Sequence, residues 1–404
     1  MKVIVIGGGA AGFFAAITCA RENPAVRVTL LERSSRVLGK VKISGGGRCN
    51  VTHACFDPTA LVGFYPRGGQ ALRGPFTRFQ PRDTVAWFAA RHVVLKTEAD
   101  GRMFPVSDDS QTIIDCLMAE AKAAGVDLRL NAQIQTLRKS AAGGFDVTFA
   151  AGDTLSGARV ILATGSGAAG WDWAQALGHS IEPPVPSLFT FTVKDPRLEG
   201  LAGISVPQAK IQIADTPLAQ EGPLLITHWG FSGPAALKLS AWGARILHAQ
   251  QYRTRLQIRW DAAHTSEQWL HALKQLRSDA PKKTVGAPAG PLRFPQRLWS
   301  RFLQAAGWAE ATRWADISNE QCRILTEQIQ NSVYAMDGKS TFKEEFVTCG
   351  GVRLDEVDFR TLESKRCPGL YFAGEVLDVD AVTGGFNFQN AWTTGWIAGT
   401  SAAR

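Results

Sequence analysis

Three glycines near the start of the chain, Gly7, Gly9 and Gly12, have the G-x-G-x-x-G spacing and directly follow the apolar run 3–6. A second apolar run ends at Glu32, twenty residues after Gly12. Glycines in this spacing permit a tight turn and let a helix N-terminus approach a pyrophosphate. An acid at the end of the second strand accepts hydrogen bonds from ribose hydroxyls. The strand, helix and acid together predict a site for an adenine dinucleotide.

A second group of glycines and acids lies near the other end of the chain. The apolar run 370–373 is followed by Gly374 and Glu375. Further on, a Gly-Gly pair at 384–385 precedes a helical pattern over 386–398. The strand end at Gly374 and Glu375 suits the ribityl hydroxyls of a flavin. The N-terminus of the following helix suits the electron-rich pyrimidine edge of the flavin ring. NAD alone would not need this second site, so we predict FAD as the cofactor. An ordinary strand with a packing helix is the alternative.

A glycine-rich loop at 36–50 follows Glu32. Its three consecutive glycines, 45–47, permit backbone conformations that are closed to other residues, and Arg48 and Asn50 supply hydrogen-bond donors where the loop ends. We interpret the loop as one that lies against the flavin. An ordinary surface loop is the alternative.

A second G-x-G-x-x-G, at Gly165, Gly167 and Gly170, follows the apolar run 160–163. It suggests a separate NAD(P)H-binding domain. However, a proline-rich segment follows, where that unit would require a second strand ending in an acid. We therefore interpret residues 163–165 as a return to the first nucleotide domain.

The remaining pattern places these motifs in an α/β fold. Apolar spacing predicts helices over 83–92 and 109–125, and short strands over 128–130, 134–137, 145–149 and 158–163. The middle of the chain has short β patterns at 189–193, 209–213, 223–227 and 255–260, and helical patterns at 266–276, 295–306 and 319–331. Because the nucleotide domain needs both ends of the chain, this middle part is interpreted as an insertion.

Composition limits the protein class. A chain of 404 residues is too long for one ordinary core, so two or three domains are expected. The apolar content of 45% and the lack of a run long enough to cross a bilayer give no reason to infer a membrane or a stable protein partner. The net charge of +8 favours anionic partners without indicating nucleic acid by itself. Seven cysteines without C-x-x-C spacing argue against a metal site or a disulfide framework and fit the cytoplasm.

Three motifs in order carry a family resemblance: GGGRCN at 45–50, THWGFSGPA at 227–235, and the segment 369–392 with GLYFAGEVLDVD and TGGFNFQNAW. The chain resembles the BaiN-like family of 3-dehydro-bile-acid reductases, which also includes YhiN-type flavoproteins and large-subunit rRNA dihydrouridine synthase. The resemblance covers essentially the whole chain and implies non-covalently bound FAD. It also implies a discontinuous, Rossmann-like FAD-binding domain, residues 1–190 and 346–404, with an inserted β-barrel and small helical domain at 191–345.

The resemblance also implies which residues hold the cofactor. The fingerprint glycines and Glu32 would hold the ADP half, the loop 45–50 would line the flavin, and residues 374–375 and 384–387 would close the site. The full set is Gly7, Gly9, Ala10, Ala11, Gly12, Glu32, Arg33, Lys40, Gly46, Gly47, Arg48, Asn50, Ile134, Ala163, Thr164, Gly165, Gly374, Glu375, Gly384, Gly385, Phe386 and Asn387. Family members often carry Asn where this chain has His53, and Gly-Gly with a following proline near Ser166. Substrate preference is therefore not transferred from any one member.

A flavin performs hydride chemistry itself, whereas the protein places the substrate and handles a proton. Reduction of a polarised C=C bond adds a hydride to one carbon and a proton to the other, so a positioned acid is useful. The candidate catalytic residues are His228, which lies beside Trp229, and Cys49; Cys349 is a further candidate. A structural role stays open for His228, and a small buried side chain is the simpler interpretation of both cysteines.

Three functions remain open from the sequence. We expect an FAD-dependent oxidoreductase that reduces a polarised C=C bond of a small molecule, with NAD(P)H as a transient reductant. The alternative is an enzyme that reduces a uridine of rRNA to dihydrouridine, and Lys282, Lys283 and the segment 293–297 offer the basic surface that it would need. A non-catalytic flavin-binding redox protein is the third hypothesis.

Overall fold

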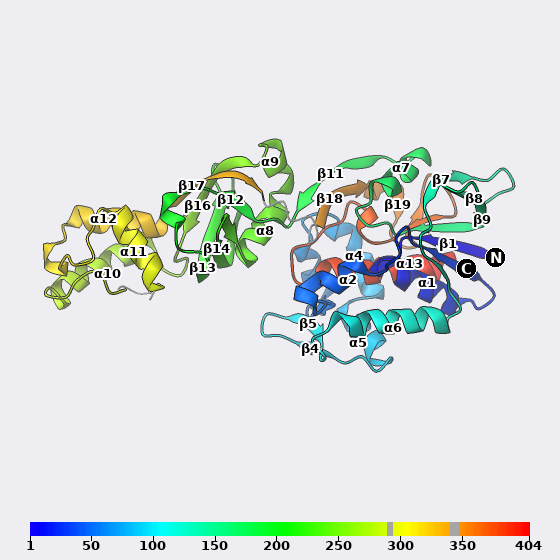
Figure 1. Cartoon of the computed structure of the whole chain (residues 1–404), viewed down its shortest axis with the longest axis horizontal. Coiled ribbons are helices and arrows are strands. Elements are labelled where there is room, and N and C mark those ends of the chain that lie inside the picture. The colour runs from blue at the N-terminus through cyan, green and yellow to red at the C-terminus, as the bar shows by residue number, and fades with distance from the viewer. Residues whose placement is uncertain (289–293, 340–346) are drawn as a thin grey trace. The chain divides into compact units, whose positions relative to one another are not determined.

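The computed structural model describes residues 1–288, 294–339 and 347–404 (Figure 1). The chain divides into two compact units, Met1–Ser187 with Phe342–Arg404, and Leu188–Thr341. The first unit therefore uses both ends of the chain. The expected domain limits at 190 and 346 stay predictions, and residue 346 lies outside the described residues.

A seven-stranded sheet forms the centre of the first unit, in the order β19-β20-β21-β10-β1-β2-β6. The parallel strands are β1 (Lys2–Ile6), β2 (Arg27–Leu31), β6 (Asp127–Arg129), β10 (Arg159–Leu162) and β21 (Leu370–Phe372); the antiparallel edge strands are β19 (Val357–Asp358) and β20 (Glu363–Ser364). In the middle of the sheet, Val5 of β1 lies opposite Leu30 and Ile161. All three side chains are fully buried, which explains why these strands read as continuous apolar runs.

Two helices from opposite ends of the chain pack closely together. They are α1 (Ala10–Glu22) and α13 (Phe386–Ala402). A Cβ added at Gly395 would lie 2.7 Å from the carbonyl oxygen of Ala11, and one added at Gly399 would overlap that of Ala15. Glycine at these two positions lets the helix backbones approach, and the discontinuous Rossmann-like fold is confirmed.

The other elements of the first unit surround this core. The helices are α2 (Gly39–Ile43), α3 (Pro58–Leu61), α4 (Gly69–Arg78), α5 (Pro81–Ala89), α6 (Ser110–Ala123) and α7 (Ala168–Ala176). Small antiparallel sheets are formed by β3 (Thr52–His53), β5 (Arg102–Pro105) and β4 (Leu95–Thr97), by β7 (Ile134–Lys139), β8 (Phe145–Phe149) and β9 (Thr154–Gly157), and by β11 (Ile181–Ser187) with β18 (Val347–Val352). The predicted helices α5 and α6 are confirmed, and Asp109 caps α6 by accepting a hydrogen bond from the Gln111 N–H.

The second G-x-G-x-x-G does not open another nucleotide-binding unit. Its preceding strand, β10, pairs with β1 in the main sheet, as predicted. After α7 the chain enters β11, which pairs antiparallel with β18. A Cβ added at Gly170 would overlap the hydroxyl of Thr164, so this glycine serves local packing.

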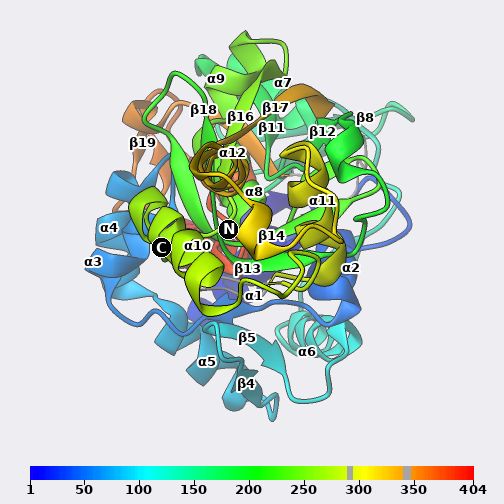
Figure 2. The same cartoon turned by 90° about the vertical axis from the view of Figure 1, so that its left-hand side faces the viewer.

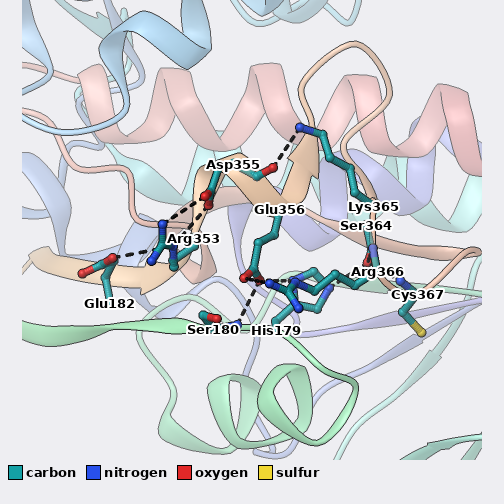
Figure 3. Close-up of polar contacts among 10 residues, drawn as sticks. All are labelled: His179, Ser180, Glu182, Arg353, Asp355, Glu356, Ser364, Lys365, Arg366 and Cys367. Carbon is teal, nitrogen blue, oxygen red and sulfur yellow. Dashed lines mark hydrogen bonds and ion pairs between the residues drawn. The ribbon is translucent and has the colours of Figure 1, made fainter.

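A buried polar network ties the edge of the main sheet to the segment that follows α7 (Figure 3). His179 Nδ1 lies 3.1 Å from Oε2 of Glu356, and Nε2 lies 2.7 Å from the Ser364 hydroxyl. That hydroxyl also accepts the N–H groups of Arg366 and Cys367. Since Ser364 is surrounded in this way and buried, the arrangement joins elements and does not present a nucleophile.

The second unit contains a closed six-stranded barrel in the order β12-β15-β14-β13-β16-β17. The strands are β12 (Phe191–Val193), β13 (Ser205–Ile213), β14 (Ala219–Thr227), β15 (Gly230–Ser232), β16 (Arg253–Arg259) and β17 (Ser332–Lys339). Residues alternate along β17 between buried and exposed, as a barrel requires, with Tyr334 and Met336 buried. The predicted inserted barrel is confirmed.

Helices complete the second unit. Figure 1 shows α10, α11 and α12 gathered at one end of the barrel, and in Figure 2 this end faces the viewer. The helices are α8 (Pro234–Trp242), α9 (Ala244–Ala249), α10 (Ser266–Asp279), α11 (Gln296–Ala305) and α12 (Asn319–Gln330). Thr265 and Ser318 begin α10 and α12 with capping boxes. Trp269 of α10, Trp299 of α11 and Trp314 are buried in this part of the chain. Within the described residues, no helix has the length and apolar character needed to cross a membrane.

Candidate flavin site

Glu32 is held at the end of β2 by two backbone groups. Its Oε2 accepts the Gly8 N–H over 2.8 Å, and its Oε1 accepts the Ser34 N–H over 2.9 Å. These bonds fix the half-buried carboxylate beside the turn from β1 to α1, and each oxygen has a further lone pair for a ribose hydroxyl. The neighbouring Arg33 is exposed.

The fingerprint glycines show how a pyrophosphate would fit. Gly7 has a φ of 114°, and a Cβ added at Gly12 would overlap the carbonyl oxygen of Gly7. These two positions therefore need glycine for the turn itself. A Cβ at Gly9 would meet no atom within 4 Å, although Gly9 is the residue that caps α1, with Ala10 and Ala11 in its first turn. The open space at a helix N-terminus is the cradle that a pyrophosphate requires.

The glycine-rich loop is held from one side and open on the other. A Cβ at Gly45 would lie 2.8 Å from the Phe104 ring, whereas Cβ atoms at Gly46 and Gly47 would meet nothing within 4 Å. The Arg48 guanidinium lies 4.0 Å from the centre of the Phe104 ring and pairs with Glu98 over 2.6 Å. Arg48 therefore ties the loop to the β4–β5 hairpin, a contact that its sequence motif did not indicate, and its role at the cofactor stays a prediction.

Cys49 ends the loop in a left-handed conformation with a φ of 60°, and its side chain is fully buried. Burial raises the pKa of the Cys49 thiol to about 12. A thiol that keeps its proton so firmly is a weak acid near neutral pH. This favours the structural interpretation of Cys49. Cys349, on β18, is likewise fully buried.

The structure brings Lys40 and Glu375 together from distant parts of the sequence. Lys40 Nζ lies 2.5 Å from Glu375 Oε2 and 3.4 Å from the Ser166 hydroxyl. The other carboxylate oxygen, Oε1, accepts the Thr348 N–H over 2.9 Å. A Cβ at Gly165 would lie 3.8 Å from this carboxylate. Predicted cofactor residues from the α2 region, the end of β10 and the C-terminal motif thus form one cluster.

Four further predicted residues lie near these strand ends. A Cβ added at Gly7 would overlap the carbonyl oxygen of Ala163, so these two residues lie close together. Thr164 follows Ala163 directly. Ile134 begins β7, two residues after Ala132, whose N–H bonds to the Glu32 carbonyl over 2.8 Å. On the C-terminal side, Gly374 lies against α1, where its Cβ would be 2.8 Å from that of Ala11.

The N-terminus of α13 closes on the glycine-rich loop. Gly385 caps this helix with a φ of 92°, and a Cβ there would lie 2.5 Å from the Thr52 carbonyl oxygen. With its amide oriented to satisfy both neighbours, Asn50 accepts the Gly385 N–H over 3.0 Å and donates to the Thr52 carbonyl over 3.1 Å. The Asn387 amide accepts the Ala381 N–H and donates to its carbonyl, at 2.9 and 3.0 Å. Asn387 thus closes the preceding loop.

Sequence reasoning missed the aromatic side chains around Phe386. The Phe64 ring stacks on it with centres 4.2 Å apart, and the His53 ring does so at 4.6 Å. Tyr65 donates its hydroxyl proton to the Phe386 carbonyl over 2.6 Å. His53 could have been noticed, because related sequences often carry Asn at this position. Phe64 and Tyr65 lie in no motif, so the sequence gave no reason to single them out.

A buried ion pair was also missed. Arg67 Nε lies 2.5 Å from Asp380 Oδ1, and Ser187 donates to Oδ2 over 2.8 Å. Asp380 is fully buried, and burial raises its pKa although Arg67 opposes that change. The pair holds the loop that leads to Gly384.

The remaining predicted residues lie in the second unit. His228 lies in the turn between β14 and β15 and is exposed, beside the partly exposed Trp229. Its catalytic role stays a prediction. Lys282 and Lys283 are exposed, whereas Arg297 donates to the Gly200 carbonyl over 2.7 Å. The expected basic residue at 293 lies outside the described residues.

The family model of the HI0933-like protein Rossmann domain matches residues 1–401. The chain belongs to this family. Two curated relatives extend over nearly its whole length. A 3-dehydro-bile acid delta(4,6)-reductase from Clostridium scindens is 29% identical, covering 100% of this chain and 99% of that protein. A ribosomal RNA dihydrouridine synthase from Escherichia coli is 30% identical, covering 97% of this chain and 96% of that protein.

Solved structures share the fold. A 3-ketosteroid-delta4-(5alpha)-dehydrogenase from Rhodococcus jostii RHA1 has a TM-score of 0.52 at 19% identity, covering 100% of this chain and 97% of that one. Membership of the HI0933-like family, together with the whole-length relative named as a reductase, shows that the protein is an FAD-dependent oxidoreductase. The predicted cofactor and enzyme class are thus confirmed, against the hypothesis of a non-catalytic redox protein.

Proposed function

We propose that this HI0933-like protein reduces a polarised C=C bond of a small molecule, with NAD(P)H as the electron donor. The observation that carries the proposal is the closure of the glycine-rich loop on α13 through Asn50 and Gly385. This contact joins the loop that carries the open glycines 46 and 47 to a helix N-terminus, and such an arrangement supports a flavin ring bound beside them. The choice of bond is supported by the whole-length relative named as a bile acid reductase.

When bound, FAD would supply the hydride chemistry. The carboxylate of Glu32 would hold the ribose, and the N-terminus of α1 at Gly9 would bind the pyrophosphate. The N-terminus of α13 would favour negative charge on the pyrimidine edge. His228 is proposed as the group that delivers the proton to the second carbon of the C=C bond. We further propose a reducing cytoplasmic setting, which suits a chain whose seven cysteines show no C-x-x-C spacing.

The proposal is tested by mixing anaerobic, FAD-loaded protein with NADH or NADPH and following the flavin absorbance. The reduced protein is then mixed with 2-cyclohexenone and with 4-androstene-3,17-dione as enone probes. We expect rapid flavin reduction by one nucleotide, followed by reoxidation and a saturated ketone product. Failure of both nucleotides would reject the donor, and failure of a panel of such enones would reject the bond type.

The second candidate function is reduction of uridine in rRNA. It is favoured by the relatives from Escherichia coli and Haemophilus influenzae that are named ribosomal RNA dihydrouridine synthase, at 30% and 27% identity. The exposed Lys282 and Lys283 would suit a phosphate backbone. Nucleoside analysis of large-subunit rRNA from a deletion strain separates the two functions. Loss of one dihydrouridine, restored by the gene, would favour the RNA substrate, and unchanged rRNA would favour the small molecule.

A further inference from the structure

A cavity of about 570 Å³ lies within the first unit, away from the candidate flavin site. It is formed by the last residues of β7, the C-terminal end of α7 and the turn that precedes β21. Pro368 in this turn comes before the amino end of β21, whereas Gly374 of the flavin site follows the carboxyl end of the same strand. The cavity has the size of a small-molecule site, and none of the residues assigned to FAD lines it.

Cations line this cavity and are held in place. Arg138 and Lys139 come from β7 and Arg366 comes from the turn, and among the described residues that line the cavity none is acidic. Lys139 Nζ donates to the carbonyl of Pro368 over 2.6 Å and lies 4.2 Å from the centre of the Phe145 ring. The ammonium group is thereby fixed between β7 and the turn. A lysine has three N–H donors, so two are left to bind a ligand.

Arg366 is anchored by a carboxylate that lies outside the cavity. Its Nη2 lies 2.7 Å from Glu356 Oε1 (Figure 3), and the Arg366 side chain is 51% exposed. Glu356 belongs to the buried network of His179 and does not line the cavity. A guanidinium has five N–H donors, so an anion in the cavity can bond to Arg366 without displacing Glu356.

The other carboxylates near the cavity are engaged by uncharged groups. Asp146 lies opposite Arg138 in the β7–β8 register, and its Oδ1 accepts the Ser156 hydroxyl over 2.6 Å. Glu363, close to the turn in the sequence, accepts the Gly369 N–H over 2.7 Å. Neither carboxylate lines the cavity. The cations from β7 therefore meet no acidic side chain inside it.

The end of α7 does not require these cations either. The Leu177 N–H lies 3.1 Å from the Trp173 carbonyl oxygen, and the Gly178 N–H bonds to the Gln175 carbonyl over 2.9 Å. Backbone groups thus satisfy the last carbonyls of the helix. Leu177 and Pro368 also line the cavity, so apolar surface lies next to the cations.

We propose that this cavity binds a small organic anion, a molecule with one sulfonate, carboxylate or phosphate group and a compact apolar body. The anionic group would accept charge-assisted hydrogen bonds from Arg138, Lys139 and Arg366. The apolar body would cover Leu177 and Pro368 and lose contact with water. This site is separate from the flavin site and does not depend on the proposed reaction.

The test is calorimetric titration of FAD-loaded protein with 2-naphthalenesulfonate, so that the flavin site is already occupied. Its uncharged counterpart, 2-naphthalenesulfonamide, is titrated in parallel. One variant combines Arg138→Gln with Lys139→Gln, and another, Ala176→Trp, fills the cavity from the end of α7. Lys122→Gln and Gln175→Trp are the matched controls, because both residues are exposed and lie outside the cavity. Urea unfolding is recorded for every protein.

We expect wild-type protein and both controls to bind one naphthalenesulfonate per chain, more weakly as salt is added. The charge variant and Ala176→Trp should each bind it about tenfold more weakly or worse, since charged hydrogen bonds or the space for the ring are lost. The sulfonamide should bind wild-type protein about tenfold more weakly for the same reason. If the charge variant unfolds more readily, Ala176→Trp decides, because it keeps both cations.

Three results would overturn the inference. The first is an unchanged affinity in Ala176→Trp, which would place the probe elsewhere on the protein. The second is equal affinity for the sulfonate and the sulfonamide, which would show that the cations do not bind the ligand. The third is the lack of saturable binding to wild-type protein at probe concentrations up to about 1 mM.

Discussion

The Thr52 hydroxyl donates a hydrogen bond to Oε1 of Gln389 over 2.6 Å and so joins residues that are 337 positions apart in the sequence. The same oxygen accepts the Thr84 hydroxyl over 2.9 Å. Gln389 itself is fully buried in α13. The segment that follows the glycine-rich loop is thereby fixed to the helix whose N-terminus faces the candidate flavin site.

Gln389→Leu should therefore lower both stability and FAD affinity. The substitution leaves two buried hydroxyls without their acceptor, at a cost of about 1–3 kcal/mol each. Urea unfolding of the protein without FAD measures the first effect, and flavin fluorescence measures the second. Gln135→Leu is the control, because Gln135 is exposed on β7. Equal stability of the two variants would contradict the role assigned to Gln389.

Gly9→Val and Gly12→Val should fail in different ways. In Gly9→Val the valine side chain would enter open space, so the protein should still fold. The same side chain would fill the pyrophosphate cradle, so FAD binding should be lost. The Gly12 side chain would collide with the backbone of Gly7, so that variant should unfold or aggregate. Circular dichroism and bound-flavin content separate the two results. Gly74→Val is a control, since its added Cβ also meets nothing within 4 Å. Normal FAD content in Gly9→Val would disprove the cradle.

Gly167→Val should change FAD affinity by less than about tenfold, roughly 1.4 kcal/mol. Gly167 only caps α7, and its Cβ would lie 3.2 Å from the Thr164 carbonyl oxygen, a contact that a small backbone shift relieves. Equilibrium binding of FAD and NADPH to wild-type and variant protein provides the measurement. A selective loss of NADPH affinity would show that the second glycine motif binds a nucleotide after all.

The parts of the site that were predictable are those set by local spacing. Gly7, Gly12 and Glu32 lie on one strand–turn–helix–strand unit, so their spacing alone determined where they meet. The C-terminal glycines were predictable for the same reason, since Gly385 begins a helix whose apolar pattern was plain.

The contacts that were not predictable depend on tertiary packing. Lys40 and Glu375 are 335 positions apart, and nothing in either local pattern indicates the other. The role of Arg48 at the cofactor stays a prediction, but its contacts with Phe104 and Glu98, which come from a different hairpin, could not be foreseen from the glycine motif. Such partners follow from the fold as a whole and leave no periodic signal in the sequence.

The network of His179 should make stability fall in acid. Burial lowers the pKa of His179, so the unfolded chain takes up this proton first and folding loses free energy as the pH falls below about 6.5. Burial alone would raise the pKa of Glu356, but the Ser180 N–H and the Arg366 charge lower it. The loss of folding free energy therefore continues to lower pH.

His179→Gln should be about 1–3 kcal/mol less stable than wild-type protein at pH 7.5. Between pH 7.5 and 5.5, the variant should lose less free energy of unfolding than wild-type protein. Urea unfolding at the two pH values checks this, with exposed His271→Gln as control. Parallel pH profiles would show that His179 does not titrate in this way.

His228→Ala should separate the two halves of the proposed reaction. Flavin reduction by the nicotinamide needs no proton from this residue, whereas saturation of the C=C bond does. Loss of a general acid slows its step by about 10²–10⁴-fold. Stopped-flow absorbance of each half-reaction, with the enone probes, measures both rates. His248→Ala serves as a control on the same unit, because that side chain lies on α9 and is exposed. If both half-reactions slow together, or neither does, His228 is structural, and the proton must come from another group or from water.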